Sequence, residues 1–170
     1  SLAGWLLGHY ARRPGLRRLA RPAAALFLGL VLGLGLLAHG VLKENWGRAR
    51  PVQVSQFGGE ASFTPPWQPT SECRRNCSFV SGHAGTGFAL IALGALATAR
   101  RRRFWLVTGW SAGLLLGALR IAQGGHFLSD VLFGGLLLWG TSLAIRACWT
   151  RWRLRRWHKL RHPATRKALT

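Results

Sequence analysis

The sequence predicts an all-α fold: a polytopic membrane helix bundle in which about four transmembrane helices form a single membrane-embedded domain over residues 1–170. Three observations support this prediction. The chain contains four long apolar runs, its basic residues cluster between alternate runs, and glycines are frequent within the runs. Four consecutive helices this apolar would leave almost no polar face for water, so a soluble helical protein is disfavoured.

The apolar runs define the expected transmembrane helices. A helix needs ~20 predominantly apolar residues to cross a bilayer, and each run reaches or approaches that length. Arg120 near the end of the third run and Asp130 near the start of the fourth are expected at the membrane interface. Glycine is costly inside a soluble helix but permits close packing between membrane helices. The four expected spans are residues 22–42, 79–99, 104–122 and 126–147.

The charge distribution predicts how these helices are oriented. The chain has 24 Lys and Arg against four Asp and Glu, for a formal net charge of +20. Nucleic-acid binding is disfavoured, because the charges lie between apolar runs rather than along one polar face. Eighteen basic residues fall before the first run, between the second and third, or at and beyond the end of the fourth, where Arg146 lies. The positive-inside rule makes these segments cytoplasmic, including both ends and the basic tail 148–170.

The loop 43–78 is therefore expected on the non-cytoplasmic side. All four acidic residues and six cations lie on that side as well. The topology rule would not have placed these cations there, so they need a separate reason, and binding an anion is one. The six cations are Lys43, Arg48, Arg50, Arg74, Arg75 and Arg120.

His126 and Asp130 form the first candidate catalytic pair. They are four residues apart, so on one helix they share a face and can approach within hydrogen-bonding distance. An Asp that accepts from one imidazole nitrogen leaves the other nitrogen free as a nucleophile or base. An ionisable residue inside an apolar run is also a functional candidate. The alternative is a buried His–Asp pair that only orients helices.

The topology brings further polar residues to the same membrane depth. Lys43, Arg50 and Arg120 match the geometry and charge of phosphate oxygens; singly, each could instead be an interfacial side chain that reaches the headgroups. Ser81 and Gly82 begin the second span, where free backbone N–H groups favour an anion. We expect His83 to act as a general acid toward a leaving oxygen. His39 is expected to be a packed or interfacial histidine.

The cysteines allow two interpretations. Cys73 and Cys77 could close a small disulfide loop in an oxidising compartment, or they could be free thiols. A zinc site formed with His83 is disfavoured, because there is no fourth ligand and the spacing matches no structural zinc pattern. Cys148 is expected to be a packed, reduced thiol. We therefore predict no metal and no cofactor.

Together these residues resemble the type 2 phosphatidic acid phosphatase superfamily, which includes membrane lipid phosphatases and vanadium-dependent haloperoxidases. The family's first motif, Lys, six residues, Arg-Pro, matches Lys43 to Pro51. The second, Pro-Ser-Gly-His, matches residues 81–83, with Val80 replacing Pro. The third motif is Ser-Arg, five residues, His, three residues, Asp. Leu119 stands in place of its Ser. Its matching residues are Arg120, His126 and Asp130.

The resemblance implies a role for each matching residue. His126, oriented by Asp130, would attack phosphorus and form a phosphohistidine, and His83 would protonate the departing group. Water would then release phosphate. The phosphoryl oxygens would be held by Lys43, Arg50, Ser81, Gly82 and Arg120. No metal is needed for this chemistry, in which positioning and charge stabilisation carry most of the catalysis.

Membrane members of the family usually have six helices, with the first motif after the third. Here that motif follows the first expected span, so the chain resembles the catalytic last four helices. Either two helices are absent from this sequence or this is a minimal member. Residues 2–10 are expected to be the remnant of a preceding helix.

The residues around 57–79 are similar to the bacterial branch of the family that includes lipid A phosphatases. This implies an enzyme of the bacterial inner membrane with a periplasmic active site. The candidate substrates are lipid A, undecaprenyl pyrophosphate, phosphatidylglycerol phosphate and phosphatidic acid, with lipid A favoured. The alternatives are a lipid phosphotransferase and a non-catalytic binder of anionic lipid, whereas a haloperoxidase is disfavoured because those relatives are soluble. The expected partners are the lipid phosphate and the bilayer; the oligomeric state is left open.

Overall fold

The computed structural model describes residues 14–161, and within that range the chain is all-helical, as the sequence predicts. The described segment has no β-strand; its one β-bridge joins Val54 to Ala61. The expected remnant helix at residues 2–10 lies outside the described residues. In chain order the helical elements are α2 (Pro14–Leu28), π-helix η1 (Gly29–Lys43), 3₁₀-helices η2 (Pro51–Gln53) and η3 (Ser55–Phe57), α3 (Gly82–Phe88), 3₁₀-helix η4 (Ala89–Gly94), α4 (Ala99–Ala122) and α5 (Leu128–Arg161).

Three of the described helical segments are long and apolar enough to cross a membrane. They are Leu19–Lys43, formed by α2 and η1 together, Ala99–Ala122 and Leu128–His158. These correspond to the first, third and fourth expected spans. The third begins five residues earlier than expected, and α5 continues far beyond the expected end at residue 147. The chain is therefore a multi-pass membrane protein.

The second expected span, residues 79–99, differs from the prediction. It is helical only over α3 and η4, from Gly82 to Gly94. Seven α-helical and six 3₁₀ residues rise about 22 Å, which is shorter than the ~30 Å hydrocarbon core. Turns occupy residues 95–97 before α4 begins. This segment is the buried centre of the bundle rather than a full-length span.

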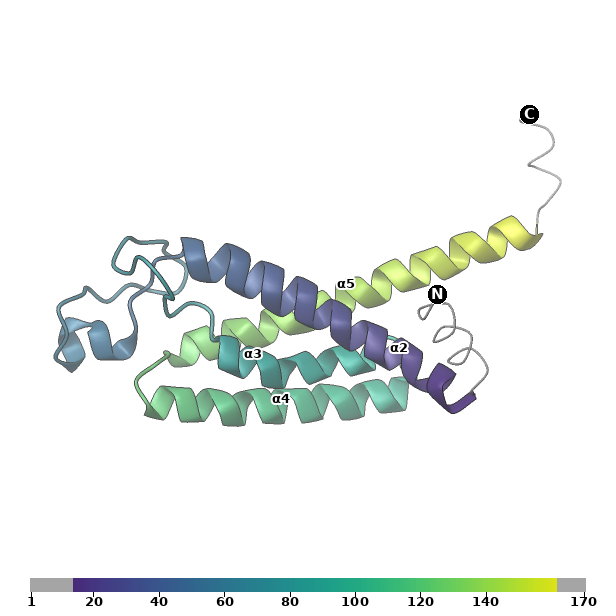
Figure 1. Cartoon of the computed structure of the whole chain (residues 1–170), viewed down its shortest axis with the longest axis horizontal. Coiled ribbons are helices and arrows are strands. Elements are labelled where there is room, and N and C mark those ends of the chain that lie inside the picture. The colour runs from purple at the N-terminus through teal and green to yellow at the C-terminus, as the bar shows by residue number, and fades with distance from the viewer. Residues whose placement is uncertain (1–13, 162–170) are drawn as a thin grey trace, which may run out of the picture.

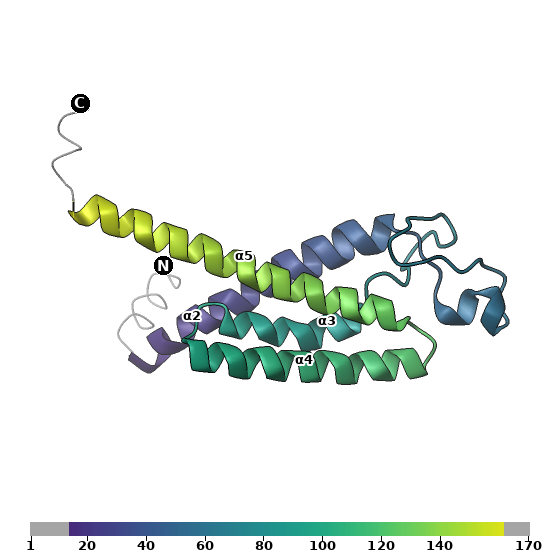
Figure 2. The ribbon, with the colours of Figure 1, turned by 180° about the vertical axis from the view of Figure 1, so that it is seen from behind.

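The polar loop and the helix ends that carry the candidate residues gather at one end of the bundle (Figures 1 and 2). η1 enters this end at Lys43, α3 leaves it at Gly82, α4 returns to it at Ala122, and α5 leaves it again. The opposite end holds the start of α2, the turn between η4 and α4, and the far part of α5 (Figure 1). The convergence expected from the sequence therefore occurs.

The core lies around α3, where five of the seven residues are buried. Phe88 is fully buried against Val131 and Leu138 of α5, and its ring meets Trp110 of α4 at 5.1 Å between centroids. Large apolar side chains on the outer faces are exposed instead, among them Leu115 and Phe104. Such exposure is expected where the surroundings are lipid.

Glycine contacts set the distance between α3 and α4. A Cβ added at Gly87 would lie 2.7 Å from the backbone nitrogen of Gly113, and one added at Gly113 would lie 2.2 Å from the ring of Phe88. Small residues at membrane helix interfaces allow this approach. By contrast, a Cβ at Gly140 on α5 would have no neighbour within 4 Å.

We expect Gly87→Ala to destabilise the protein by about 1–3 kcal/mol, because the added methyl overpacks a backbone contact. The matched substitution Gly140→Ala enters open space, so we expect a neutral or slightly stabilising effect. Thermal unfolding in detergent micelles measures both. Equal melting temperatures for the two variants would contradict the close contact between α3 and α4.

Candidate active site

The segment after η1 is held in place by backbone hydrogen bonds to a later part of the loop. The carbonyls of Trp46, Gly47 and Arg48 accept from the N–H groups of Thr70, Cys73 and Ser78, at 2.9, 2.8 and 2.9 Å respectively. Gly47 has φ +67°, and a Cβ there would lie 1.6 Å from the carbonyl oxygen of Thr70. Glycine is needed at this position, because a side chain would prevent the pairing.

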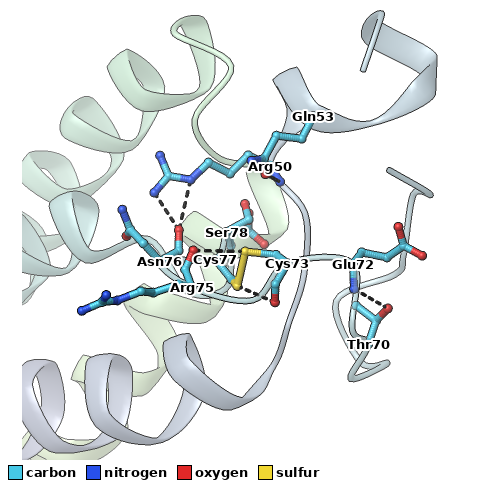
Figure 3. Close-up of a disulfide and its surroundings, with 10 residues drawn as sticks. Arg50, Gln53, Thr70, Glu72, Cys73, Arg75, Asn76, Cys77 and Ser78 are labelled. Atoms are coloured by element: carbon cyan, nitrogen blue, oxygen red, sulfur yellow. Dashed lines mark hydrogen bonds between the residues drawn. A yellow bond between two sulfur atoms is a disulfide. The ribbon is translucent and has the colours of Figure 1, made fainter. Parts of the chain in front are cut away.

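A disulfide joins Cys73 to Cys77 within this loop, with their Cα atoms 5.6 Å apart (Figure 3). The small ring presents the carbonyl of Asn76 to Arg50, whose Nη2 and Nε donate to it at 2.8 and 3.3 Å (Figure 3). The position of the Arg50 guanidinium therefore depends on the disulfide loop.

Asp130 lies in the first turn of α5, whereas His126 precedes the helix, so the expectation that one helix carries both is wrong. Both side chains are almost fully buried. His126 Nδ1 is 3.7 Å from Asp130 Oδ2, and this nitrogen has no hydrogen-bond partner among the described residues. The Asp130 carboxylate is occupied by other donors. Its Oδ2 accepts from the backbone N–H of Phe127 at 2.9 Å and from the hydroxyl of Ser78.

Arg48 is the main site residue that the sequence analysis did not single out. Its side chain is 1% exposed and forms an ion pair with Asp130 through Nη1. Arg48 also donates to the hydroxyl of Ser129 at 2.8 Å and to the carbonyl of Thr64 at 2.9 Å. Its guanidinium carbon lies 4.3 Å from the ring centroid of Phe127. The only sequence signal was its place among the six cations on this side.

Three of the other five cations lie in a cluster around His83. The charges of Arg120, Lys43 and Arg50 all act on the His83 imidazole. Lys43 is 8% exposed; the charges of Arg50 and Arg120 repel it and that of Glu44 attracts it. Its side chain forms no hydrogen bond or ion pair within residues 14–161. Arg120 donates to the side chain of Gln123, while its Nε is buried without a partner in the described structure. An anion would relieve this repulsion and satisfy these donors.

Ser81 and Gly82 lie where α3 begins, beside this cluster. The Ser81 hydroxyl accepts from the backbone N–H of Ala84 at 3.4 Å and so caps the helix, while its own N–H donates to the carbonyl of Asp130 at 3.2 Å. A Cβ at Gly82 would lie 2.7 Å from Nε2 of His39. The absence of that side chain lets His39 approach the cluster, so His39 is an exposed neighbour of the site rather than a buried packing residue.

A cavity of about 490 Å³ reaches His126 from the surface. It lies between the loop that follows Arg50 and the turn between α4 and α5. Most of its lining is apolar, including Val52, Phe57 and Leu128. His126 therefore borders a cavity at the loop end of the bundle, although its side chain is only 1% exposed.

Comparison with known proteins identifies the family. Residues 24–156 match the PAP2 superfamily. The chain belongs to this superfamily. The resemblance drawn from the three motifs is thereby confirmed, including the branch to which it pointed, because the similar PAP2 proteins are lipid A phosphatases.

Three relatives illustrate this similarity. The chain is 43% identical over 119 residues to the lipid A 4'-phosphatase of Francisella tularensis subsp. novicida, a match that covers 69% of this chain and 54% of that protein. It is 40% identical to the lipid A 4'-phosphatase of Rhizobium etli, in a match that covers 69% of this chain and 44% of that protein. It is 36% identical to the lipid A 1-phosphatase of Rhizobium etli, in a match that covers 74% of this chain and 51% of that protein. The chain thus spans about half the length of the curated relatives it matches, and no solved structure matches it significantly.

The PAP2 motif residues thus lie at one end of the bundle, in two sets that differ in burial. His126 and Asp130 are buried with Arg48 and Ser78, whereas His83 is exposed on the first turn of α3. Leu119, which replaces the motif Ser, is 55% exposed on α4 and takes no part in the hydrogen bonds of the site. The replacement therefore breaks none of the hydrogen bonds described here.

We expect Arg48→Gln to destabilise this PAP2 protein by about 3–5 kcal/mol, because it leaves the buried Asp130 carboxylate unpaired. The control is Arg74→Gln, which removes an exposed loop arginine. The double variant Arg48→Gln/Asp130→Asn should recover part of the lost stability, because the stranded charge is gone. Chemical denaturation in micelles measures all three. An Arg48→Gln variant as stable as Arg74→Gln would contradict the importance of the ion pair.

Proposed function

We propose that this protein is a membrane lipid phosphatase that hydrolyses a phosphate monoester of lipid A by a metal-independent, histidine-based mechanism. The observation that carries the proposal is the proximity of His126 to a cluster of unpaired cations at one end of a membrane-spanning bundle. Such a cluster suits a dianionic phosphate, and a buried imidazole beside it supplies the nucleophile.

In the proposed reaction, Nε2 of His126 attacks phosphorus and the bond to the ester oxygen breaks. The orientation of the ring supports this assignment, since Nδ1 is the nitrogen that faces Asp130. His83 gives its proton to the departing oxygen, so the lipid leaves as an alcohol. Water then attacks the phosphohistidine with His83 as the base, and inorganic phosphate is released. Lys43, Arg50 and Arg120 stabilise the charge on the phosphoryl oxygens in both steps, with Ser81 and Gly82 alongside them.

The substrate assignment rests on two observations. The relatives are named as lipid A phosphatases, and three of the four act at the 4' position according to their names. In addition, the cavity beside His126 has a mostly apolar lining, which suits a lipid better than a small soluble ester.

We further propose that the protein lies in a bacterial inner membrane with the loop 43–78 in the periplasm and both ends of the four-helix segment in the cytoplasm. The arginine clusters at the opposite end of the bundle support this orientation. The disulfide also suits an oxidising compartment.

The central test replaces His126 by Ala and measures phosphate released from lipid A with a chelator present throughout. We expect activity to fall by roughly 10⁴-fold or more, because the nucleophile is lost. The control His158→Ala removes an exposed histidine at the far end of α5 and should keep full activity.

Each alternative outcome has a separate meaning. Chelator-sensitive activity would contradict the metal-independent mechanism. Loss of lipid phosphate without free phosphate would identify a phosphotransferase. Unchanged release by His126→Ala would overturn the role of this residue, and mass spectrometry of the product identifies which phosphate has been removed.

The proposed orientation is tested with Cys148, the only cysteine of the chain outside the disulfide. Its side chain is exposed, so the expectation of a packed thiol is wrong. We expect a membrane-impermeant maleimide to label it in permeabilised spheroplasts but not in intact ones. Conversely, a Ser55→Cys variant that also carries Cys148→Ser should be labelled in intact spheroplasts. The reverse pattern would show that the loop faces the cytoplasm.

A further inference from the structure

A second cavity lies at the end of the bundle opposite the candidate active site. It has a volume of about 500 Å³ and is formed by η4, the start of α4 and the middle of α5. Three arginines line it: Arg102 and Arg103 from α4, and Arg146 from α5. Ser142 of α5 also lines the cavity, and its hydroxyl donates a hydrogen bond to the carbonyl of Ile91 in η4.

None of these three arginine side chains forms an ion pair or hydrogen bond within the described part of the chain. The sequence explains why. The protein has only four acidic residues: Glu44, Glu60, Glu72 and Asp130. The three glutamates lie in the distant loop, and Asp130 lies at the other end of α5. No acidic side chain of the protein is therefore placed to neutralise this cluster. Arg102 and Arg103 are exposed and Arg146 is half-buried, so an anion from outside the chain can reach them.

The rest of the lining is mostly apolar and opens toward the lipid. Ile91 and Leu106 form its inner wall, and Trp139 and Leu143 form its outer edge on α5. Trp139 is 38% exposed and Leu143 is 48% exposed, so this edge lies on the surface that faces the bilayer. A cationic end next to an apolar wall matches the phosphate and the hydrocarbon chain of a phospholipid.

The depth of the cavity agrees with this match. Arg146 lies 16 residues after Asp130 on one helix, which corresponds to a rise of about 24 Å. The hydrocarbon core of a bilayer is ~30 Å thick. When the candidate active site lies at one membrane interface, the three arginines therefore lie near the headgroups of the opposite leaflet.

We propose that this cavity binds the phosphate of an anionic phospholipid in the leaflet opposite the candidate active site. The guanidinium groups hold the phosphate oxygens, and the apolar wall of the cavity contacts an acyl chain. Basic pockets between membrane helices are suited to such headgroups. This binding does not depend on the proposed phosphatase activity.

The test uses the full chain, delipidated in detergent and titrated with dioleoylphosphatidylglycerol or dioleoylphosphatidylcholine. Native mass spectrometry counts the bound lipids, and thermal unfolding reports the stabilisation. The wild type should prefer the anionic lipid. The variant Arg102→Gln/Arg103→Gln/Arg146→Gln should bind it on the order of a hundredfold more weakly, from roughly fivefold per arginine.

The matched control Arg101→Gln/Arg153→Gln/Arg155→Gln removes the same charge from exposed arginines outside the cavity. It should keep wild-type affinity. An equal loss in both triple variants would show a diffuse electrostatic effect and overturn the site.

Two further outcomes decide the proposal. If inorganic phosphate alone stabilises the wild type as strongly as the lipid does, the cavity is a soluble-anion site and the lipid assignment is wrong. If the cavity variant does not fold, the wild-type titration still decides, because equal binding of the two lipids would overturn the proposal.

Discussion

The burial of Asp130 is the constraint on which the rest of the site depends. A carboxylate removed from water is costly unless it is paired and fully hydrogen-bonded. Arg48 supplies the pairing charge, and Ser78 and the N–H of Phe127 supply hydrogen bonds. Because Arg48 and Ser78 lie in the loop between η1 and α3, satisfying this one carboxylate fixes the loop on the bundle.

The same constraint explains how residues distant in sequence reach the site together. Arg48 and Ser78 are joined by a backbone hydrogen bond, so the two parts of the loop that serve Asp130 also support each other. Arg50 follows Arg48 by two residues and is held in turn by the disulfide ring at Asn76. These hydrogen bonds and the disulfide therefore hold the loop in place against the bundle, although it has little regular structure.

The sequence predicted the local features of the site and missed the long-range ones. The spacing of His126 and Asp130 correctly predicted that they lie close together, but the expectation that one helix carries both is wrong, because α5 begins at Leu128, after His126. Arg48 is 82 residues from Asp130, and a composition or periodicity argument has no access to such a pair. The second span was overestimated for a related reason. Its apolar length suggested a full crossing, whereas its glycines pack it inside the bundle, where a shorter helix suffices.

The two halves of the site differ in how their charge is balanced. Asp130 and Arg48 neutralise each other within the protein, so their ion pair is structural. Lys43 forms no ion pair in the described structure; Glu44 attracts its charge, whereas Arg50 and Arg120 repel it. Holding charges of one sign close together in a partly buried site costs free energy, and a bound anion offsets that cost. The fold therefore holds Asp130, beside His126, in a charge-balanced ion pair. It leaves a net positive charge on the cation cluster, and a bound phosphate would stabilise that part of the molecule.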